Sequence, residues 1–103
     1  MSVLLEFAMF PTDKGDSVSQ YVSEIIKMIK TSGVSYKLTA MGTIVETETL
    51  DEALAIIKQS YQTLEPHSKR VYSSIKLDIR KEKSNRLEDK IKSIESKIGN
   101  VDH

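Results

Sequence analysis

Two carboxylates, Glu6 and Glu46, are the side chains whose type and spacing could do chemistry in this sequence. Glu6 interrupts an apolar stretch at residues 3–10, and Glu46 follows the apolar part of "AMGTIVET", residues 40–47. Like charges held side by side raise each other's pKa unless a cation intervenes. Such a pair could act as a general acid and base, or it could bind a cationic or protonated ligand.

Two lysines offer a purely structural explanation for the same glutamates. If Met41 and Gly42 form a tight hairpin turn, Lys37 lies directly opposite Glu46. Lys76 belongs to a strand that we expect beside the one carrying Glu6. Cross-strand ion pairs would then neutralise both carboxylates. The spacing alone leaves the two explanations level.

Other mechanisms lack the residues that they need. The sequence has no cysteine and only two histidines, His67 and His103, so we expect neither thiolate catalysis nor a metal site. It has no phosphate-binding loop, no nucleophile paired with a base and no cofactor motif. The net charge of zero argues against binding to nucleic acid or to an anionic membrane. The first apolar run is too short to span a bilayer, and we expect a cytosolic protein.

Hydrophobic periodicity defines the elements that must position these residues. Period-two alternation or a short apolar run predicts strands at residues 3–10 and 70–82, and the stretch 36–47 reads as a hairpin. Helical spacing predicts helices within residues 17–33, where Gly33 is the expected C-cap, and 49–66. Thr49 and Glu52 stand at capping-box spacing at the start of the second helix.

The order β-α-β-β-α-β predicts an α+β, ferredoxin-like fold with a four-stranded antiparallel sheet and both helices on one face. We expect the first and third strands to be central and to run parallel. Alternation assigns these residues to the face beneath the helices: Val3, Leu5, Phe7, Met9, Val45, Ile75, Leu77 and Ile79. It assigns these to the open face: Leu4, Glu6, Ala8, Phe10, Ile44, Glu46, Ser74, Lys76 and Asp78. An open face that mixes apolar and charged residues suggests an interface or a ligand surface.

The last segment, residues 86–101, carries a narrow apolar seam with spacings of four and three between charged residues. The residues of the seam are Leu87, Ile91, Ile94, Ile98 and Val101. Such a helix suits packing on one other helix or on a neighbouring subunit, and a solvated helix docked on its own domain is the alternative. Residues 1–103 are enough for one domain, and a chain this short often shares apolar surface with a copy of itself.

Three segments resemble a known family. "SVSQYV" at the first helix, "YKLTAMGTIVE" at the hairpin and "RVYSSIKLDIRKEK" at the last strand are similar to the small ferredoxin-like thiamine-binding proteins, long a family of unknown function. The resemblance implies cytoplasmic homodimers or homotetramers that bind thiamine or its hydroxymethylpyrimidine moiety without known catalysis. One departure is Thr47, where many relatives have glycine.

The resemblance also implies a set of ligand-binding residues. Thiamine combines a cationic thiazolium with a flat aminopyrimidine. Glu46, with Glu6 beside it, would meet the amine or the cation, and hydroxyls would come from Thr43 and Ser19. Apolar walls would come from Ile44, Phe10 and Met41. Alternation puts Thr43 and Glu46 on opposite faces, so the pocket lies either on the open face or between helix and sheet.

The leading interpretation is a binding protein without catalytic activity, whose ligand is thiamine or a related pyrimidine. A second is a structural or regulatory oligomeric subunit, whose open face is only an interface. A third is an enzyme that acts on a small heterocycle, with Glu6 or Glu46 as general acid or base.

Overall fold

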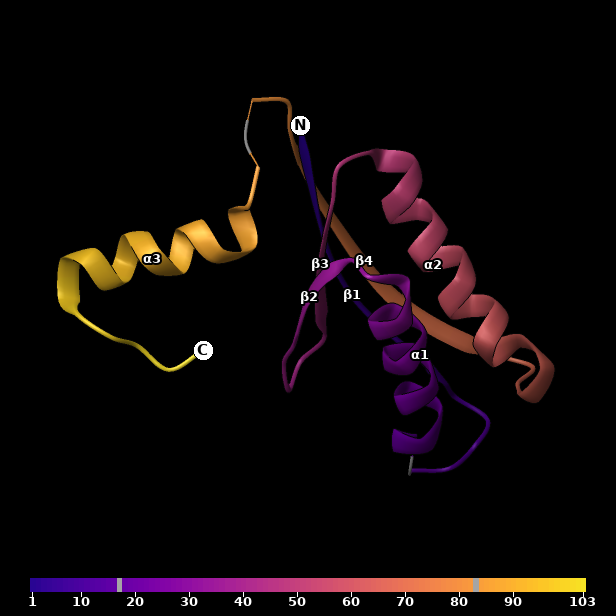
Figure 1. Ribbon diagram of the computed structural model, residues 1–103. Helices are drawn as coiled ribbons and strands as arrows, with labels where there is room; N and C mark the ends of the chain where they lie inside the picture. The colour runs from indigo at the N-terminus through magenta and orange to yellow at the C-terminus, as the bar shows by residue number, and fades with distance from the viewer. Residues whose placement is uncertain (17, 83) are drawn as a thin grey trace.

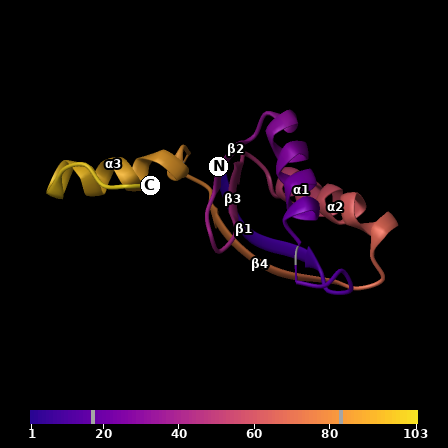
Figure 2. The ribbon, with the colours of Figure 1, turned by 90° about the horizontal axis from the view of Figure 1, so that it is seen from below.

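The computed structural model describes residues 1–16, 18–82 and 84–103. Two helices cover one face of a four-stranded antiparallel sheet, and a third helix projects away from it (Figures 1 and 2). This arrangement confirms the predicted α+β, ferredoxin-like fold. The elements are β1 (Ser2–Pro11), α1 (Ser19–Ser32), β2 (Ser35–Leu38), β3 (Thr43–Thr47), α2 (Leu50–Leu64), a 3-10 turn (Glu65–His67), β4 (Val71–Arg80) and α3 (Arg86–Ile98).

The strands lie in the order β2-β3-β1-β4, so β1 and β3 are central, as expected. They run antiparallel, with Leu5 opposite Val45, and the prediction of parallel neighbours is wrong. The reason is topological. The hairpin reverses the chain after β2, and β3 therefore returns between β1 and β2 in the opposite direction to both.

The hairpin loop spans residues 39–42 and is longer than the predicted two-residue turn. Thr39 closes it: its backbone N–H donates to the Gly42 carbonyl at 2.8 Å. Its Oγ1 also accepts from the N–H groups of Met41 and Gly42, at 3.2 and 3.1 Å. A threonine hydroxyl that bonds nearby backbone groups in this way favours a turn over continued strand.

The longer loop shifts the register by two residues. Lys37 lies opposite Ile44, and Ser35 lies opposite Glu46. The prediction that Lys37 faces Glu46 is therefore wrong. A shift of two residues keeps every side chain on its predicted face, because the side-chain period of a strand is two.

The helix caps follow their sequence signals. Thr49 Oγ1 accepts from the backbone N–H of Glu52 at 3.2 Å at the start of α2. Gly33 ends α1 in the left-handed conformation, with φ at 82°. The last helix, α3, ends at Ile98 before Gly99 and is shorter than the predicted segment to residue 101.

The core lies between the helices and the face of the sheet predicted to meet them. Val3, Leu5 and Val45 are fully buried, which confirms the alternation in β1 and β3. On β4 the alternation holds, but burial does not follow: Ile75 and Leu77 are 45% and 41% exposed. The two helices lie mainly over the other strands and leave this part of β4 uncovered (Figure 2).

Candidate functional site

A cavity of about 240 Å³ lies between α1, the second half of β1 and the hairpin loop. Its walls are largely apolar and come from three elements. They are Phe7, Ala8, Met9 and Phe10 of β1, Val22, Ile25 and Ile26 of α1, and residues 38–43 of the hairpin. The cavity therefore lies between helix and sheet, which is one of the two locations that the sequence left open.

The unequal lengths of the strands create this cavity. β3 pairs with β1 only as far as Phe7, whereas β4 accompanies β1 to Pro11. On its β3 side, the edge of β1 at residues 8–10 therefore has no strand beside it in the described part of the chain. Backbone N–H and C=O groups on such an edge are free to bond another molecule. The apolar slot is thus bordered by donors and acceptors.

Thr43 adds a side-chain hydroxyl to this border. It is 5% exposed, lies on the helix side of the sheet and lines the cavity. Among the residues that the structure describes, no charged side chain lines the cavity. Apolar walls with a few polar groups are typical of small-molecule sites and suit a flat, uncharged ligand.

The structure divides the predicted ligand-binding residues. Thr43, Phe10 and Met41 line the cavity, with Met41 90% exposed at its mouth. Ser19 is exposed one helical turn before Val22. The remaining three do not line the cavity: Glu6, Ile44 and Glu46 lie on the open side of the sheet.

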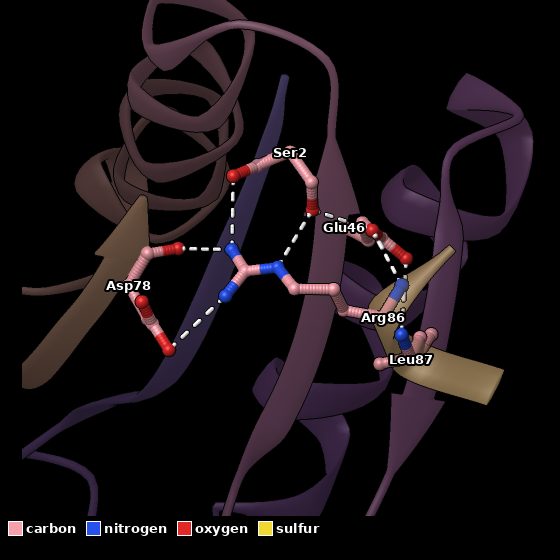
Figure 3. Close-up of polar contacts among 5 residues, drawn as sticks. All are labelled: Ser2, Glu46, Asp78, Arg86 and Leu87. Atoms are coloured by element: carbon pink, nitrogen blue, oxygen red, sulfur yellow. Dashed lines mark hydrogen bonds and ion pairs between the residues drawn. The ribbon is translucent and has the colours of Figure 1, made fainter. Parts of the chain in front are cut away.

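Glu46 binds the beginning of α3 (Figure 3). Its carboxylate accepts from the backbone N–H groups of Arg86 and Leu87 at 2.9 and 3.1 Å, and from the Ser2 hydroxyl at 2.5 Å. The first N–H groups of a helix have no partner within it, and the local cap residue Asn85 makes no side-chain bond to them. A carboxylate from a distant strand therefore caps this helix and meets the positive end of its dipole.

These contacts change the acidity of Glu46. Partial burial raises its pKa, but the bonds from Ser2, Arg86 and Leu87 together with the positive charge of Arg86 outweigh it. The net result is a pKa below the ordinary glutamate value. Glu46 therefore stays ionised at neutral pH and is poorly suited to act as a general acid.

Arg86 completes the same cluster and had no signal in the sequence. Its guanidinium donates to the Ser2 hydroxyl and carbonyl at 3.1 and 2.9 Å. It also bonds the Asp78 carbonyl and pairs with the Asp78 carboxylate at 3.1 Å. Its side chain is only 10% exposed. Arg86 therefore attaches α3 to β1 and β4 while Glu46 attaches it to β3.

Of the two lysines, one has the predicted partner and the other does not. Lys76 lies opposite Glu6 and pairs with it at 3.8 Å, as expected. Lys37 pairs with Glu88 of α3 at 3.2 Å. Glu6 lies opposite Ile44, so the two glutamates are diagonal neighbours with separate partners. Nothing in this geometry makes them share a proton or a cation.

Residues 1–16, 18–82 and 84–103 offer neither a metal-binding cluster nor a membrane-spanning helix. They contain no group of three or more histidine, cysteine or acidic side chains placed to hold a metal ion. None of the helices described is long and apolar enough to cross a membrane.

The fold and the cavity together define a ferredoxin-like domain with a largely apolar cavity between helix and sheet. Residues 5–95 match the family model described as "Thiamine-binding protein". The chain belongs to that family.

Curated relatives and solved structures agree with this membership. UPF0045 protein MJ1052 of Methanocaldococcus jannaschii is 40% identical, over 89% of this chain and 91% of its own. UPF0045 protein Mb1933 of Mycobacterium bovis is 30% identical, over 92% and 93%. The crystal structure of MJ1052 covers 90% of this chain and 95% of its own with a TM-score of 0.80. A domain of unknown function from Bacillus cereus, 29% identical, covers 88% of both chains with a TM-score of 0.76.

Proposed function

We propose that this chain binds the hydroxymethylpyrimidine moiety of thiamine, free or within the vitamin, in the cavity between α1 and the sheet, and catalyses no reaction. The observation that carries this proposal is the bare edge of β1 at residues 8–10, which borders an apolar slot beside Thr43. An aminopyrimidine is flat, with donors and acceptors along one edge. Membership of the thiamine-binding family supports the same ligand class.

The size of the cavity favours the pyrimidine over the whole vitamin. Pockets for drug-sized ligands measure about 300–1,000 Å³, and this one measures about 240 Å³. A single substituted ring suits such a space better than two linked rings. When thiamine itself binds, we expect its thiazolium to remain at the mouth, near Met41.

The charge of the lining leads to the same preference. Burying a cation without a counter-charge is costly, and the lining has no carboxylate. The thiazolium therefore gains little from entering the cavity, whereas a neutral pyrimidine pays no such penalty. We accordingly assign the specificity to the pyrimidine and no longer to a contact between Glu46 and the cation.

For the assembly we propose a cytoplasmic homodimer or homotetramer, as the family resemblance implies. A purely structural subunit is the second candidate. It is favoured by the contacts that Glu46 and Lys37 make within the chain, where both bind α3. An enzymatic function has less support. It would use Glu6 or Glu46 as general acid or base, and the lowered pKa of Glu46 makes this residue a poor general acid.

Isothermal titration with hydroxymethylpyrimidine and with thiamine tests the binding proposal. We expect both to bind and the pyrimidine to bind at least as tightly as the vitamin. Thr43→Val removes one hydroxyl and keeps the shape, so it should weaken binding about fivefold, since one buried hydrogen bond contributes about 1 kcal/mol.

Two control variants make the result specific. Thr47→Val changes the same residue type at the other end of β3, where the side chain is equally buried at 5% exposed, and should leave affinity unchanged. Glu46→Gln should also bind normally. The proposal fails if neither compound binds at millimolar concentration, or if Glu46→Gln abolishes binding while Thr43→Val does not.

A further inference from the structure

The backbone of Met9 faces the bare edge of β1 that borders the cavity. A Cβ on Gly42 would lie 3.0 Å from the Phe7 carbonyl oxygen, so that carbonyl points toward the hairpin. On the other side of β1, the Thr12 N–H donates to the Arg70 carbonyl at 3.0 Å, in line with β4. In an antiparallel sheet both backbone groups of a residue face the same neighbour, and successive residues alternate. Odd-numbered residues of β1 therefore face β3 and the hairpin, and even-numbered residues face β4.

The backbone groups of Met9 have no strand to bond. β3 pairs with β1 no further than Phe7. Within the described residues, neither the Met9 N–H nor the Met9 carbonyl has a hydrogen-bond partner. Met9 is only 6% exposed and lines the cavity. A buried donor and a buried acceptor without partners destabilise the chain, and a ligand that bonds both removes that cost.

Pro11 restricts what can occupy this edge. It is the next residue of β1 to face the same side, and proline has no backbone N–H. A strand from another chain would therefore find only Met9 with which to exchange both bonds. Proline on an edge protects it against strand pairing. The edge suits a small ligand better than a peptide strand.

We propose that the Met9 backbone recognises the amidine edge of the ligand, meaning a ring nitrogen and the exocyclic amine on the adjacent carbon. The Met9 N–H donates to the ring nitrogen, and the amine donates to the Met9 carbonyl. This inference rests on the proposed function and identifies the part of the pyrimidine that gives specificity. The ligand class is then small, flat 4-aminopyrimidines, and rings without the amine are excluded.

The amidine edge matches the backbone of a single extended residue. Side-chain amides bond an acceptor and a donor on one edge of adenine at the same time. The N–H and carbonyl of Met9 offer the same combination side by side. They are also held in place by the sheet, because Met9 lies opposite Ser73 in the ladder to β4. No rotamer has to be fixed for these two bonds, so binding loses little side-chain entropy.

A ligand analogue tests the role of the amine. In 5-hydroxymethyl-2,4-dimethylpyrimidine a methyl group of similar size replaces the amine, so the donor to Met9 is lost. We expect titration calorimetry to show at least fivefold weaker binding than for hydroxymethylpyrimidine, the factor that corresponds to about 1 kcal/mol for one hydrogen bond. If the two compounds bind equally, this inference is wrong while the proposed function stands. If neither binds at millimolar concentration, both are wrong.

Nuclear magnetic resonance tests the donor on the wild-type chain. We expect hydroxymethylpyrimidine to move the Met9 amide proton downfield and to slow its exchange with solvent. The N–H groups of Ala8 and Phe10 are the controls, because they face β4 and lie within its ladder, and their exchange should not change. An unchanged Met9 amide in the ligand-saturated protein would overturn the proposal.

A matched pair of variants removes the donor itself. Met9→Pro lacks the N–H and Met9→Ala keeps it, while both lose the methionine side chain. The proline removes no bond of the sheet, because this N–H faces the side without a strand. We expect Met9→Pro to bind hydroxymethylpyrimidine about fivefold more weakly than Met9→Ala, again the effect of one hydrogen bond. Equal affinities in two variants that circular dichroism shows to be folded would contradict the proposal. The resonance measurement decides the question if Met9→Pro does not fold.

Discussion

Glu46 shows how a single residue can be placed correctly and still be given the wrong partner. Alternation along β3 put it on the open face, where it lies. Its partners are the Ser2 hydroxyl and the first N–H groups of α3, which follow it in sequence by 40 residues or more. Period-two patterning determines the face of a residue, but only tertiary structure determines what approaches that face.

The cap formed by Glu46 predicts a pH dependence for the attachment of α3. The pKa of Glu46 is lower in the folded state than its ordinary value of 4.5. Its stabilisation is therefore fully present above about pH 4.5 and is lost as the pH falls through the folded pKa. We expect the amide signals of Arg86 and Leu87 in NMR spectra to shift together in that range.

The variant Glu46→Gln should abolish that titration at Leu87. It should also weaken α3 by about 1 kcal/mol, the usual effect of losing a helix cap. Asp78→Asn is the control, because Asp78 contacts the Arg86 side chain and not the helix N–H groups. If the Leu87 amide titrates as before in Glu46→Gln, the carboxylate is not the cap.

Position 42 requires glycine because β1 packs closely against it, and not because the backbone angle is unusual. A Cβ at this position would lie 3.0 Å from the Phe7 carbonyl oxygen, where neither backbone can easily retreat. Gly42→Ala should therefore lower stability by about 1–3 kcal/mol, the usual cost of overpacking. Chemical denaturation measures this loss, and Met41→Ala, at a position 90% exposed, should show none.

At the scale of elements, the sequence was sufficient to predict the features that depend only on nearby residues. The Thr49 capping box, the Gly33 cap and the alternation in β1 depend on nearby residues, and all three were predictable. The hairpin register was not, because Thr39 bonds the loop through its hydroxyl and so adds two residues to it. In the candidate site, Thr43 and Met41 came from family resemblance, while the bare edge of β1 depends on where β3 stops.

The attachment of α3 depends on Arg86, whose guanidinium bonds both Ser2 and Asp78. We expect Arg86→Ala to release the helix, because hydrogen bonds to charged groups contribute about 1.5–3 kcal/mol each. Hydrogen exchange should then show α3 amides losing protection while β1 and β3 remain protected. Lys90→Ala, an exposed change on the same helix, should leave that protection intact. Equal loss of protection in the sheet would show that Arg86 supports the whole domain instead.

At the scale of the whole molecule, β1 lies between the proposed ligand cavity and the β4 edge of the sheet. The strand order β2-β3-β1-β4 puts β4 at one edge, where the half-exposed Ile75 and Leu77 suit the dimer contact of the proposed assembly. The ligand cavity lies under α1 and the hairpin of β2 and β3, on the other side of β1. Leu77 lies opposite Leu5 and Thr43 lies opposite Phe7, so β1 stands between the two positions. Changes at residues that are not in contact usually add independently.

This separation predicts that ligand binding and dimer formation are thermodynamically independent. Leu77→Lys places charge in the contact between copies and should be monomeric, yet bind hydroxymethylpyrimidine with wild-type affinity. Thr43→Val should form the wild-type dimer although it binds the pyrimidine about fivefold more weakly, an effect of one lost hydrogen bond. Coupling between two sites is reciprocal, so saturating ligand should also leave the dimer dissociation constant unchanged.

Titration calorimetry on the monomeric variant, with analytical ultracentrifugation in the presence and absence of ligand, measures both directions. A change in either constant would mean that the cavity and β4 are linked through β1, the strand that borders both.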